Sequence, residues 1–208
     1  SKVYGLAKNY EAHAQFMHES GHSEIAHAPE DMVIFSKPST SVIGPDDPIV
    51  IPSYSNDMNF EPEVAVIMGR IAKNVPVEKA MDYVLGFTCV NDVTLRDLQG
   101  LDPMWTRAKG FDTSCPLGPW IQTELDWKDA KISFTLNGED VPMASGTTAN
   151  LIHGIPEQIA AISSFSTLLP GDVIMTGTPN ASGHLDPGDE PIVHVAGIGS
   201  LRNVVVRG

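Results

Sequence analysis

The run Phe60-Glu61-Pro62-Glu63-Val64-Ala65-Val66-Ile67-Met68-Gly69 joins two acids to an uninterrupted apolar segment. An apolar segment of this length predicts a buried β-strand. Residues two apart on a strand share a face, so Glu61 and Glu63 should point the same way, roughly 7 Å apart along the chain. Two like charges repel at a buried strand end, so this pair needs a compensating positive charge.

A third acid follows the next apolar run, Val84 to Val90, which leads into Asn91-Asp92. Three carboxylates that converge from neighbouring strands form an oxygen-rich site for a hard divalent cation, so we predict that Glu61, Glu63 and Asp92 bind Mg²⁺. Each part also has a simpler interpretation. Most Glu-x-Glu pairs are solvated strand faces, and Asp92 is equally suited to cap a helix that starts at Thr94.

Positive and amide side chains follow the third acid directly. Arg96 and Gln99 stand at helical spacing, and Lys109 comes shortly afterwards. The formal net charge of the chain is −13, so a site for an acidic substrate needs local cations. A bound metal together with Arg96 and Lys109 would supply them.

These motifs resemble the fumarylacetoacetate hydrolase family, in the same order and over nearly the whole chain. The segments that carry the resemblance are Asn9-Tyr10-x-x-His13-Ala14, Glu61-x-Glu63, Gly86-Phe87-Thr88, Asn91 to Gln99, Lys109-Gly110-Phe111-Asp112-Thr113, Cys115 to Trp120, Pro170 to Ile174, Thr176-Gly177-Thr178-Pro179 and Gly197-Ile198-Gly199. The resemblance is specific for the family and not for a substrate.

The resemblance implies a fold and a type of reaction. The fold is β-rich α+β, a rolled sandwich of mixed β-sheets like the C-terminal domain of the fumarylacetoacetate hydrolases, usually assembled as a homodimer. The activity is that of a Mg²⁺- or Mn²⁺-dependent enzyme acting on a small 2-oxo or 1,3-dicarbonyl acid through a metal-bound enolate. Hydrolysis of a C–C bond, decarboxylation and isomerisation share this intermediate, and the sequence leaves all three open.

The resemblance also assigns roles to individual residues. His13 and Lys109 are the expected catalytic residues, with Asp112 as a candidate partner of Lys109. The side chains expected to bind the substrate are Arg96, Gln99, Lys109 and Thr178. A neutral imidazole near pH 7 suits the task of a general base.

The segment around His13 departs from the family at one position. Many relatives carry a Glu three residues after this His, which completes a pair that activates water, whereas this chain has Phe16. Decarboxylation and tautomerisation need no activated water, so Phe16 argues against hydrolysis specifically. Asn9 is the expected cap of a short helix through Met17, and residues 11–35 form the expected lid over the site.

Two other interpretations stay open from the sequence. His13, His18, His22 and His27 lie close together, so a zinc hydrolase is one alternative, although no H-E-x-x-H or similar spacing supports it. A domain that binds metal without catalysis is the other, and Phe16 motivates it.

Length and composition favour one globular catalytic domain over residues 1–208, of which 42% are hydrophobic and 19% charged. The acidic net charge argues against a nucleic acid or an anionic membrane as partner, and no apolar run reaches the roughly 20 residues that span a bilayer. No signal peptide is visible, and we expect two reduced cysteines, Cys89 and Cys115, in a cytoplasmic protein. Because bacterial relatives often carry a small N-terminal domain, we expect such a domain upstream of Ser1.

Short strands dominate the rest of the chain, as in a β-rich α+β domain. Asn137-Gly138 predicts a type I′ hairpin turn after a strand from Lys131 to Leu136. Pro156 fits the first turn of a helix through Phe165, with Ile159, Ile162 and Phe165 expected to face the core.

Overall fold

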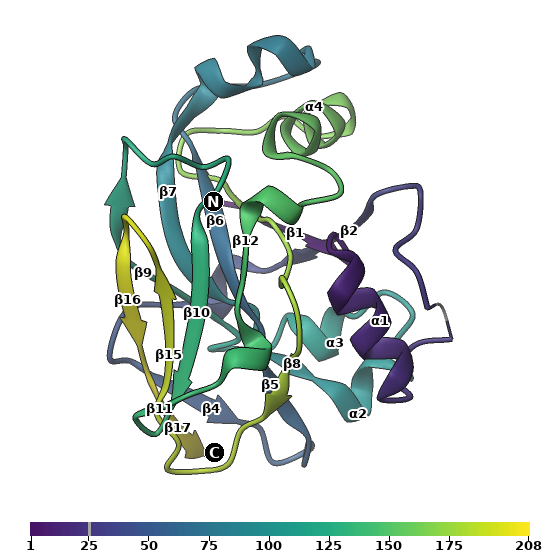
Figure 1. Cartoon of the computed structure of the whole chain (residues 1–208), viewed down its shortest axis with the longest axis vertical. Helices are drawn as coiled ribbons and strands as arrows, with labels where there is room; N and C mark the ends of the chain where they lie inside the picture. The colour runs from purple at the N-terminus through teal and green to yellow at the C-terminus, as the bar shows by residue number, and fades with distance from the viewer. Residues whose placement is uncertain (25) are drawn as a thin grey trace.

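The computed structural model describes residues 1–24 and 26–208 and shows two facing β-sheets with helices at their edges (Figure 1). The larger sheet has seven strands, in the order β2 (Val33–Lys37), β1 (Val3–Ala7), β13 (Val173–Met175), β6 (Pro62–Met68), β7 (Val84–Asn91), β9 (Cys115–Gln122) and β3 (Val42–Ile43). β1 pairs with β13 and β3 with β9 in parallel, while the other neighbours are antiparallel, so the sheet is mixed.

The second sheet lies against β6 and β7. It consists of β11 (Glu139–Asp140), β10 (Lys131–Leu136), β15 (Pro191–Val195) and β16 (Gly199–Arg202), with β12 (Gly146–Thr147) paired to β10. Two smaller sheets complete the described strands, one of β14 (Gly183–His184), β5 (Met58–Phe60) and β8 (Thr94–Leu95), the other of β17 (Val204–Arg207) and β4 (Pro48–Ile51).

Helices are few and short. The α-helices are α1 (Glu11–Glu19), α2 (Arg96–Gln99), α3 (Thr106–Lys109) and α4 (Ile155–Phe165), and 3₁₀ turns cover Ser39–Ser41, Val77–Tyr83, Pro142–Ala144 and Thr148–Asn150. In Figure 1, α1, α2 and α3 lie on the side of the large sheet that is remote from β10, β15 and β16. Among the described residues, no helix combines the length and the apolar character needed to cross a bilayer.

Alternation along β6 separates two apolar clusters. Val64, Val66 and Met68 pack into the core between the sheets, where they share a cluster with side chains of β10 and β15. Ala65 and Ile67 point to the opposite face and join a smaller cluster. Because strand side chains alternate, Glu61 and Glu63 belong to the face of Ala65 and Ile67, away from the sandwich core.

β7 brings the third acid to the same face. In the antiparallel register Glu63 pairs with Val90 and Pro62 with Asn91, and Val90 belongs to the smaller cluster. Asp92, two residues beyond Val90, therefore faces the side on which Glu61 and Glu63 lie.

The structure confirms the β-rich α+β fold and several local predictions. Asn137 and Gly138 have φ values of 54° and 83°, as a type I′ turn between β10 and β11 requires. Helix α4 carries Ile159 and Ile162 in the core. Cys89 and Cys115 are both buried and free, as expected of reduced thiols.

Two predictions about local structure were wrong, and so was one alternative interpretation. Phe165 at the end of α4 is 59% exposed instead of facing the core. Asn9 does not cap α1: Tyr10 holds the cap position, and the Asn9 amide bridges the carbonyls of His153 and Thr176. No helix begins at Thr94, because Thr94 and its neighbour pair with β5 as β8.

The predicted lid, residues 11–35, contains α1, the irregular segment after it and the start of β2. Its last three residues belong to the large sheet, where Val33–Lys37 pairs along the whole length of β1. Ile25, which falls within the predicted lid, lies outside the described residues.

A candidate metal centre beneath helix α1

The three predicted metal ligands come together in the fold. Glu61, Glu63 and Asp92 are 4%, 2% and 1% exposed, and each offers a carboxylate oxygen within 4.8 Å of the others. Glu61 stands between β5 and β6, where its backbone N–H donates to Asn91 Oδ1 at 2.9 Å and its carbonyl accepts from the Asp92 N–H at 2.9 Å. These backbone contacts fix the first and third acids relative to each other.

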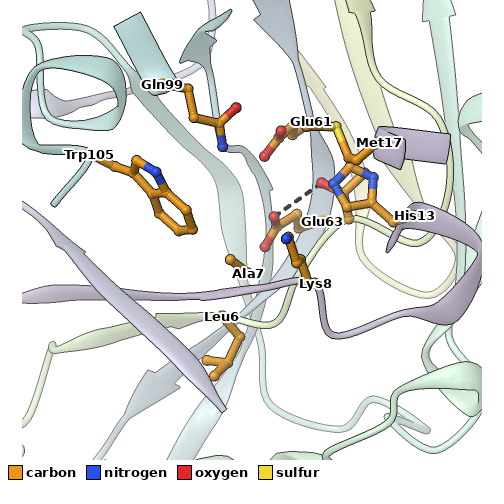
Figure 2. A pocket seen from close by; sticks show the side chains of 10 residues that line it. Leu6, Ala7, Lys8, His13, Met17, Glu61, Glu63, Gln99 and Trp105 are labelled. Atoms are coloured by element: carbon orange, nitrogen blue, oxygen red, sulfur yellow. Dashed lines mark hydrogen bonds between the residues drawn. The ribbon is translucent and has the colours of Figure 1, made fainter. Parts of the chain in front are cut away.

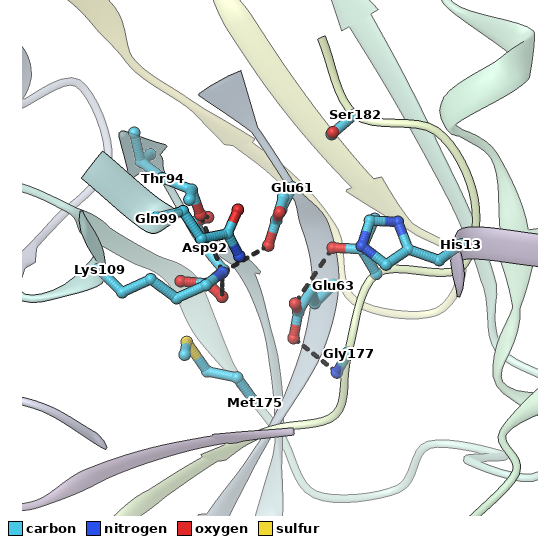
Figure 3. Close-up of polar contacts among 12 residues, drawn as sticks. His13, Glu61, Glu63, Asp92, Thr94, Gln99, Lys109, Met175, Gly177 and Ser182 are labelled. Atoms are coloured by element: carbon cyan, nitrogen blue, oxygen red, sulfur yellow. Dashed lines mark hydrogen bonds and ion pairs between the residues drawn. The ribbon is translucent and has the colours of Figure 1, made fainter. Parts of the chain in front are cut away.

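Two of the predicted cations compensate these acids. Lys109 Nζ, at the end of α3, donates to Glu61 Oε2 at 2.8 Å, to Asp92 Oδ2 at 2.6 Å and to Thr94 Oγ1 at 2.9 Å (Figure 3). Arg96 Nη2 pairs with the other oxygen of Glu61. Buried charges are tolerated only when they are paired and hydrogen-bonded, and these contacts meet that requirement.

Arg96 is held in place by neutral partners on both sides. Its Nη1 donates to Gln99 Oε1 at 2.7 Å, one turn along α2, and its Nη2 donates to Ser182 Oγ at 2.7 Å. The spacing of Arg96 and Gln99 in the sequence thus produces a direct contact. Ser182 was missed, because nothing in its neighbourhood in the sequence links it to Arg96.

A further cation, Lys37 on β2, was missed as a member of the site. Its side chain is fully buried, and Nζ lies 2.8 Å from Asp92 Oδ1. Lys37 Nζ also donates to the carbonyls of Val93, Lys109 and Ser114, at 3.2, 2.5 and 2.8 Å. Since its hydrogens are directed to carbonyls, the buried Asp92 Oδ1 is left without a hydrogen bond. The signal in the sequence that could have found it is the position of Lys37 just after the apolar run Met32 to Phe35.

Glu63 faces a different set of neighbours. Its Oε2 accepts from the Gly177 N–H at 2.7 Å and its Oε1 from Thr178 Oγ1 at 3.1 Å, so the loop after β13 reaches the acids, as Figure 3 shows for Gly177. Gly177 has a φ of 104°, and a Cβ there would approach Asn9 and Leu6, so glycine is required at this contact. The Thr178 hydroxyl, predicted to bind substrate, contacts the Glu63 carboxylate in the structure.

The carboxyl groups of Glu61 and Glu63 have pKa values that are shifted in opposite directions. Burial raises the pKa of Glu63 well above its usual value, and the neighbouring Asp92 and Glu61 charges raise it further. Burial alone would raise the pKa of Glu61 too, but Lys109 and Arg96 hold it well below its usual value. Burial alone would lower the pKa of Lys109, but Asp92 and Glu61 raise it, so Lys109 stays an ammonium.

These observations fit a divalent cation. The donors are carboxylate oxygens, which hard cations such as Mg²⁺ and Mn²⁺ prefer. Asp92 Oδ1 is ion-paired with Lys37 but not hydrogen-bonded, and the repulsion between the acids, which adds to burial in raising the pKa of Glu63, is what a bound cation relieves. Within residues 1–24 and 26–208, this is the only group of three or more His, Cys, Asp or Glu side chains with such spacing.

Within the part of the chain that the structure describes, the N-terminal histidines form no second group of metal ligands. His18 Nδ1 contacts the carbonyl of Ser23 at 3.1 Å, and His27 pairs with Glu11 on an exposed face. Asp112 is exposed and is not among the hydrogen-bond partners of Lys109, so the predicted pairing with that lysine is wrong. Lys109 is satisfied instead by two of the metal-ligand candidates.

His13 covers the acids from α1. It lines the same pocket as Glu61, Glu63, Gln99 and Thr178 (Figure 2) and is 6% exposed. His13 Nδ1 lies 2.5 Å from the Asn180 carbonyl, which only accepts, so the ring proton resides on Nδ1 and Nε2 keeps its lone pair.

The environment of His13 keeps the ring neutral. Burial lowers the pKa of His13, and this outweighs the charge of Glu61, which acts in the opposite sense. The ring of Phe16 lies one turn along α1, with a centroid separation of 6.5 Å from the His13 ring. Among the described residues, no carboxylate is hydrogen-bonded to His13, so the imidazole is a base without an acidic partner.

Comparisons with known proteins show the family to which the chain belongs. A family model described as "Fumarylacetoacetate (FAA) hydrolase C-terminal" matches residues 2–206. The crystal structure of 5-carboxymethyl-2-hydroxymuconate delta-isomerase from Mycobacterium smegmatis is 45% identical, with a TM-score of 0.89, over 100% of this chain and 79% of that one. Fumarylpyruvate hydrolase from Pseudomonas aeruginosa, in complex with Mn²⁺ and pyruvate, is 29% identical, with a TM-score of 0.89, over 100% of this chain and 90% of that one.

A curated relative has a named activity. Oxaloacetate tautomerase Fahd2a, a mitochondrial protein of Rattus norvegicus, is 37% identical over 99% of this chain and 66% of its own length. These relatives are longer than the chain, and the matched region covers the whole acidic site and the helix that carries His13.

Proposed function

Because the chain belongs to the fumarylacetoacetate hydrolase family, we propose that it is a divalent-metal-dependent enzyme that tautomerises a small 2-oxo acid. The observation that carries this proposal is His13: a buried, neutral imidazole with its proton fixed on Nδ1, its Nε2 facing the pocket, and no carboxylate beside it. Such a group moves a proton without activating water.

The three acids would hold the metal ion. Glu61, Glu63 and Asp92 are the proposed ligands, and Mg²⁺ or Mn²⁺ is the proposed ion, because the donors are hard oxygens and the related hydrolase structure contains Mn²⁺. When bound, the ion supplies Lewis-acid chemistry by drawing electron density from the keto and carboxylate oxygens of the substrate.

Four side chains would bind and orient the substrate. Lys109 and Arg96 carry positive charges that stabilise an anionic oxygen, and their fixed hydrogen bonds to neighbouring residues orient them in advance. Gln99 and Thr178 line the pocket; the Gln99 amide N–H₂ would donate to the carboxylate directly, and the Thr178 hydroxyl would do so by turning away from Glu63. These assignments give each of these polar side chains a task in substrate binding.

His13 Nε2 would then remove a proton from the carbon next to the keto group. The electron pair of the C–H bond moves into a new C=C bond and the C=O electron pair moves onto the oxygen. The protonated His13 then gives its Nε2 proton to that oxygen, which yields the enol and a neutral imidazole, and the reverse sequence returns the proton to carbon. No C–C bond breaks and no water is consumed. The position of Phe16 supports this outcome over hydrolysis, and the relative named oxaloacetate tautomerase makes oxaloacetate the first substrate to test.

The test follows enol and keto oxaloacetate by ultraviolet absorbance, with EDTA and after addition of Mg²⁺ or Mn²⁺. Parallel assays measure pyruvate released from oxaloacetate, cleavage of an acylpyruvate, and isomerisation of a hydroxy-dienoate. We expect metal-dependent tautomerisation that falls about 10²–10⁴-fold in His13→Gln. His18→Gln, an exposed histidine on the same helix, is the matched control.

Three results would count against the proposal. Tautomerisation unaffected by chelation or by Glu63→Ala would exclude a role for the metal. Faster cleavage of the acylpyruvate than tautomerisation would make the enzyme a hydrolase despite Phe16. Stoichiometric metal binding without turnover of any of these acids would favour a family member that has lost catalysis.

We also propose that the enzyme is a homodimer, as the family resemblance implies. Exposed apolar side chains on neighbouring strands support this: Leu85 on β7 is 47% exposed, and Trp120 and Ile121 on β9 are 59% and 44% exposed. Light scattering after size exclusion gives the molar mass directly. A monomer at micromolar concentration would contradict the proposal.

A further inference from the structure

Lys8 stands at the rim of the pocket, directly after β1. It lines the pocket together with His13 and Glu63, and Figure 2 shows its ammonium pointing into that space. The backbone φ of Lys8 is 55°, in the left-handed region that residues with a side chain rarely adopt. Backbone strain of this kind is concentrated at functional sites, where the surrounding structure maintains it.

The charge of Lys8 has no acidic partner among the described residues. Lys37, Arg96 and Lys109 each pair with a carboxylate of the site. Lys8 Nζ donates instead to Ser23 Oγ at 2.8 Å. An ammonium carries three hydrogens, so Lys8 keeps donors for an incoming acceptor. Burial lowers the pKa of Lys8, and no neighbouring acid counters this effect.

The balance of formal charges favours a substrate with two negative charges. Three buried acids, Glu61, Glu63 and Asp92, face three buried cations, Lys37, Arg96 and Lys109, so the formal charges within the site cancel. A divalent ion would add two positive charges, and Lys8 adds one more at the rim. A 2-oxo monocarboxylate brings one negative charge, whereas a 2-oxo dicarboxylate brings two. A monocarboxylate would therefore leave two of these positive charges unbalanced and a dicarboxylate only one, so the half-buried Lys8 ammonium is better compensated by the dicarboxylate.

We propose that Lys8 binds the distal carboxylate of the substrate and so selects 2-oxo dicarboxylates over 2-oxo monocarboxylates. This inference rests on the proposed function, which places the keto-acid end of the substrate at the acids and His13. The distal end then reaches the rim, where Lys8 Nζ donates hydrogen bonds to it.

The test compares oxaloacetate with 2,4-dioxopentanoate, a monocarboxylate that also undergoes keto–enol exchange. In Lys8→Gln we expect the KM for oxaloacetate to rise about tenfold or more, because a hydrogen bond to a charged group is lost, while the KM for the monocarboxylate changes less than twofold. Lys8→Arg should restore most of the preference. Lys79→Gln, at an exposed lysine, controls for the change in net charge.

A binding measurement separates this inference from the proposed activity. 2-Oxoglutarate and 2-oxopentanoate have the same carbon chain and differ only in the distal carboxylate, so their Kd values by calorimetry with Mn²⁺ present need no turnover. Tighter binding of 2-oxoglutarate by the wild-type protein, lost in Lys8→Gln and retained in Lys8→Arg, supports the role of Lys8 even if the protein catalyses nothing. Equal loss for both ligands, or no preference in the wild-type protein, overturns it.

Discussion

Asp92 has a lysine on each of its oxygens, with Lys109 Nζ 2.6 Å from Oδ2 and Lys37 Nζ 2.8 Å from Oδ1. The sequence predicts Asp92 and Lys109, since an acid after an apolar strand and a family motif mark them. It does not predict the contact of Lys37 with Asp92, because that contact forms only when β2 packs in the large sheet and brings Lys37 to a residue far along the chain. Long-range pairing of this kind leaves no local pattern.

Removal of the Lys37 ammonium should destabilise the fold strongly. In Lys37→Met, Asp92 loses one of its two cations and three buried carbonyls lose a donor. We expect the free energy of unfolding to fall by about 3–5 kcal/mol. Urea denaturation measures this, with Lys79→Met as the control that should stay within about 0.5 kcal/mol of wild type. A loss below about 1 kcal/mol for Lys37→Met would show that the ammonium is not needed.

An acid at position 16 should add hydrolysis to the activities of the enzyme. Phe16 is half-buried one turn from His13, so the carboxylate of Phe16→Glu would reach the imidazole and help it to activate water. We expect cleavage of an acylpyruvate to rise about tenfold or more, within the range of general acid–base effects. Phe16→Gln introduces a side chain of the same shape as Glu but without its charge, so cleavage of the acylpyruvate should not increase in this variant. An equal gain in both variants would mean that loss of the Phe16 ring opens the pocket to substrate or water and that the carboxylate plays no part in activating water.

At the scale of elements, Asp172 links the start of β1 to the start of β13 through hydrogen bonds. Its carboxylate accepts from the Lys2 backbone N–H at 2.8 Å, from Lys2 Nζ at 2.5 Å and from the Leu169 N–H at 2.7 Å. The sequence marks Pro170 to Ile174 as a segment that resembles the family, but it does not predict the role of Asp172, since Lys2 lies near the other end of the chain. The same limit explains Asn9, which has the composition of a helix cap and instead joins two distant loops.

The Asp172 contacts should make the free energy of unfolding depend on pH under acidic conditions. Burial alone would raise the pKa of Asp172, but the donors from Lys2 and Leu169 lower it below its usual value. Between the lowered pKa of Asp172 in the folded protein and its ordinary value near 3.9 in the unfolded chain, the unfolded chain binds more protons. The contribution of Asp172 to the free energy of unfolding is therefore fully present above this pH range and is lost as the pH falls through it. Urea unfolding from pH 6 to pH 3 should show a steeper loss for wild type than for Asp172→Asn. If the free energy of unfolding falls equally with pH in wild type and Asp172→Asn, Asp172 is not the group responsible.

At the scale of the whole molecule, the alternation along β6 decides both the core and the site. Val64 and Val66 enter the core between the sheets, while Glu61 and Glu63 point to the other side. This two-sided arrangement was predictable, because a period of two residues needs no knowledge of distant contacts. The helix through Met17 and the strand Lys131 to Leu136 were also predicted from residue patterns, whereas the packing of the two sheets and the role of His13 came from the family resemblance.

A divalent ion should stabilise the folded protein as a whole. The acids converge only in the fold, so the ion binds the native state, and at a free concentration of 100 times its Kd it should add about 2.7 kcal/mol. For a chain of this size the Tm should rise by about 5–10 °C, as scanning calorimetry with Mn²⁺ and then EDTA would measure. Glu63→Gln should abolish the rise, whereas Glu139→Gln, at an exposed acid, should keep it. Equal rises in both variants would mean that the ion binds elsewhere.

The two faces of β6 also limit how this protein can change over evolutionary time. Val64 and Val66 pack in the core on one face of β6 and Glu63 projects from the other face, so a larger or smaller residue at position 64 or 66 should also disturb the placement of the Glu63 carboxylate. Specificity for new substrates is therefore most easily gained by substitutions at Lys8 and Phe16, which lie outside β6 and can alter substrate recognition without disturbing that strand.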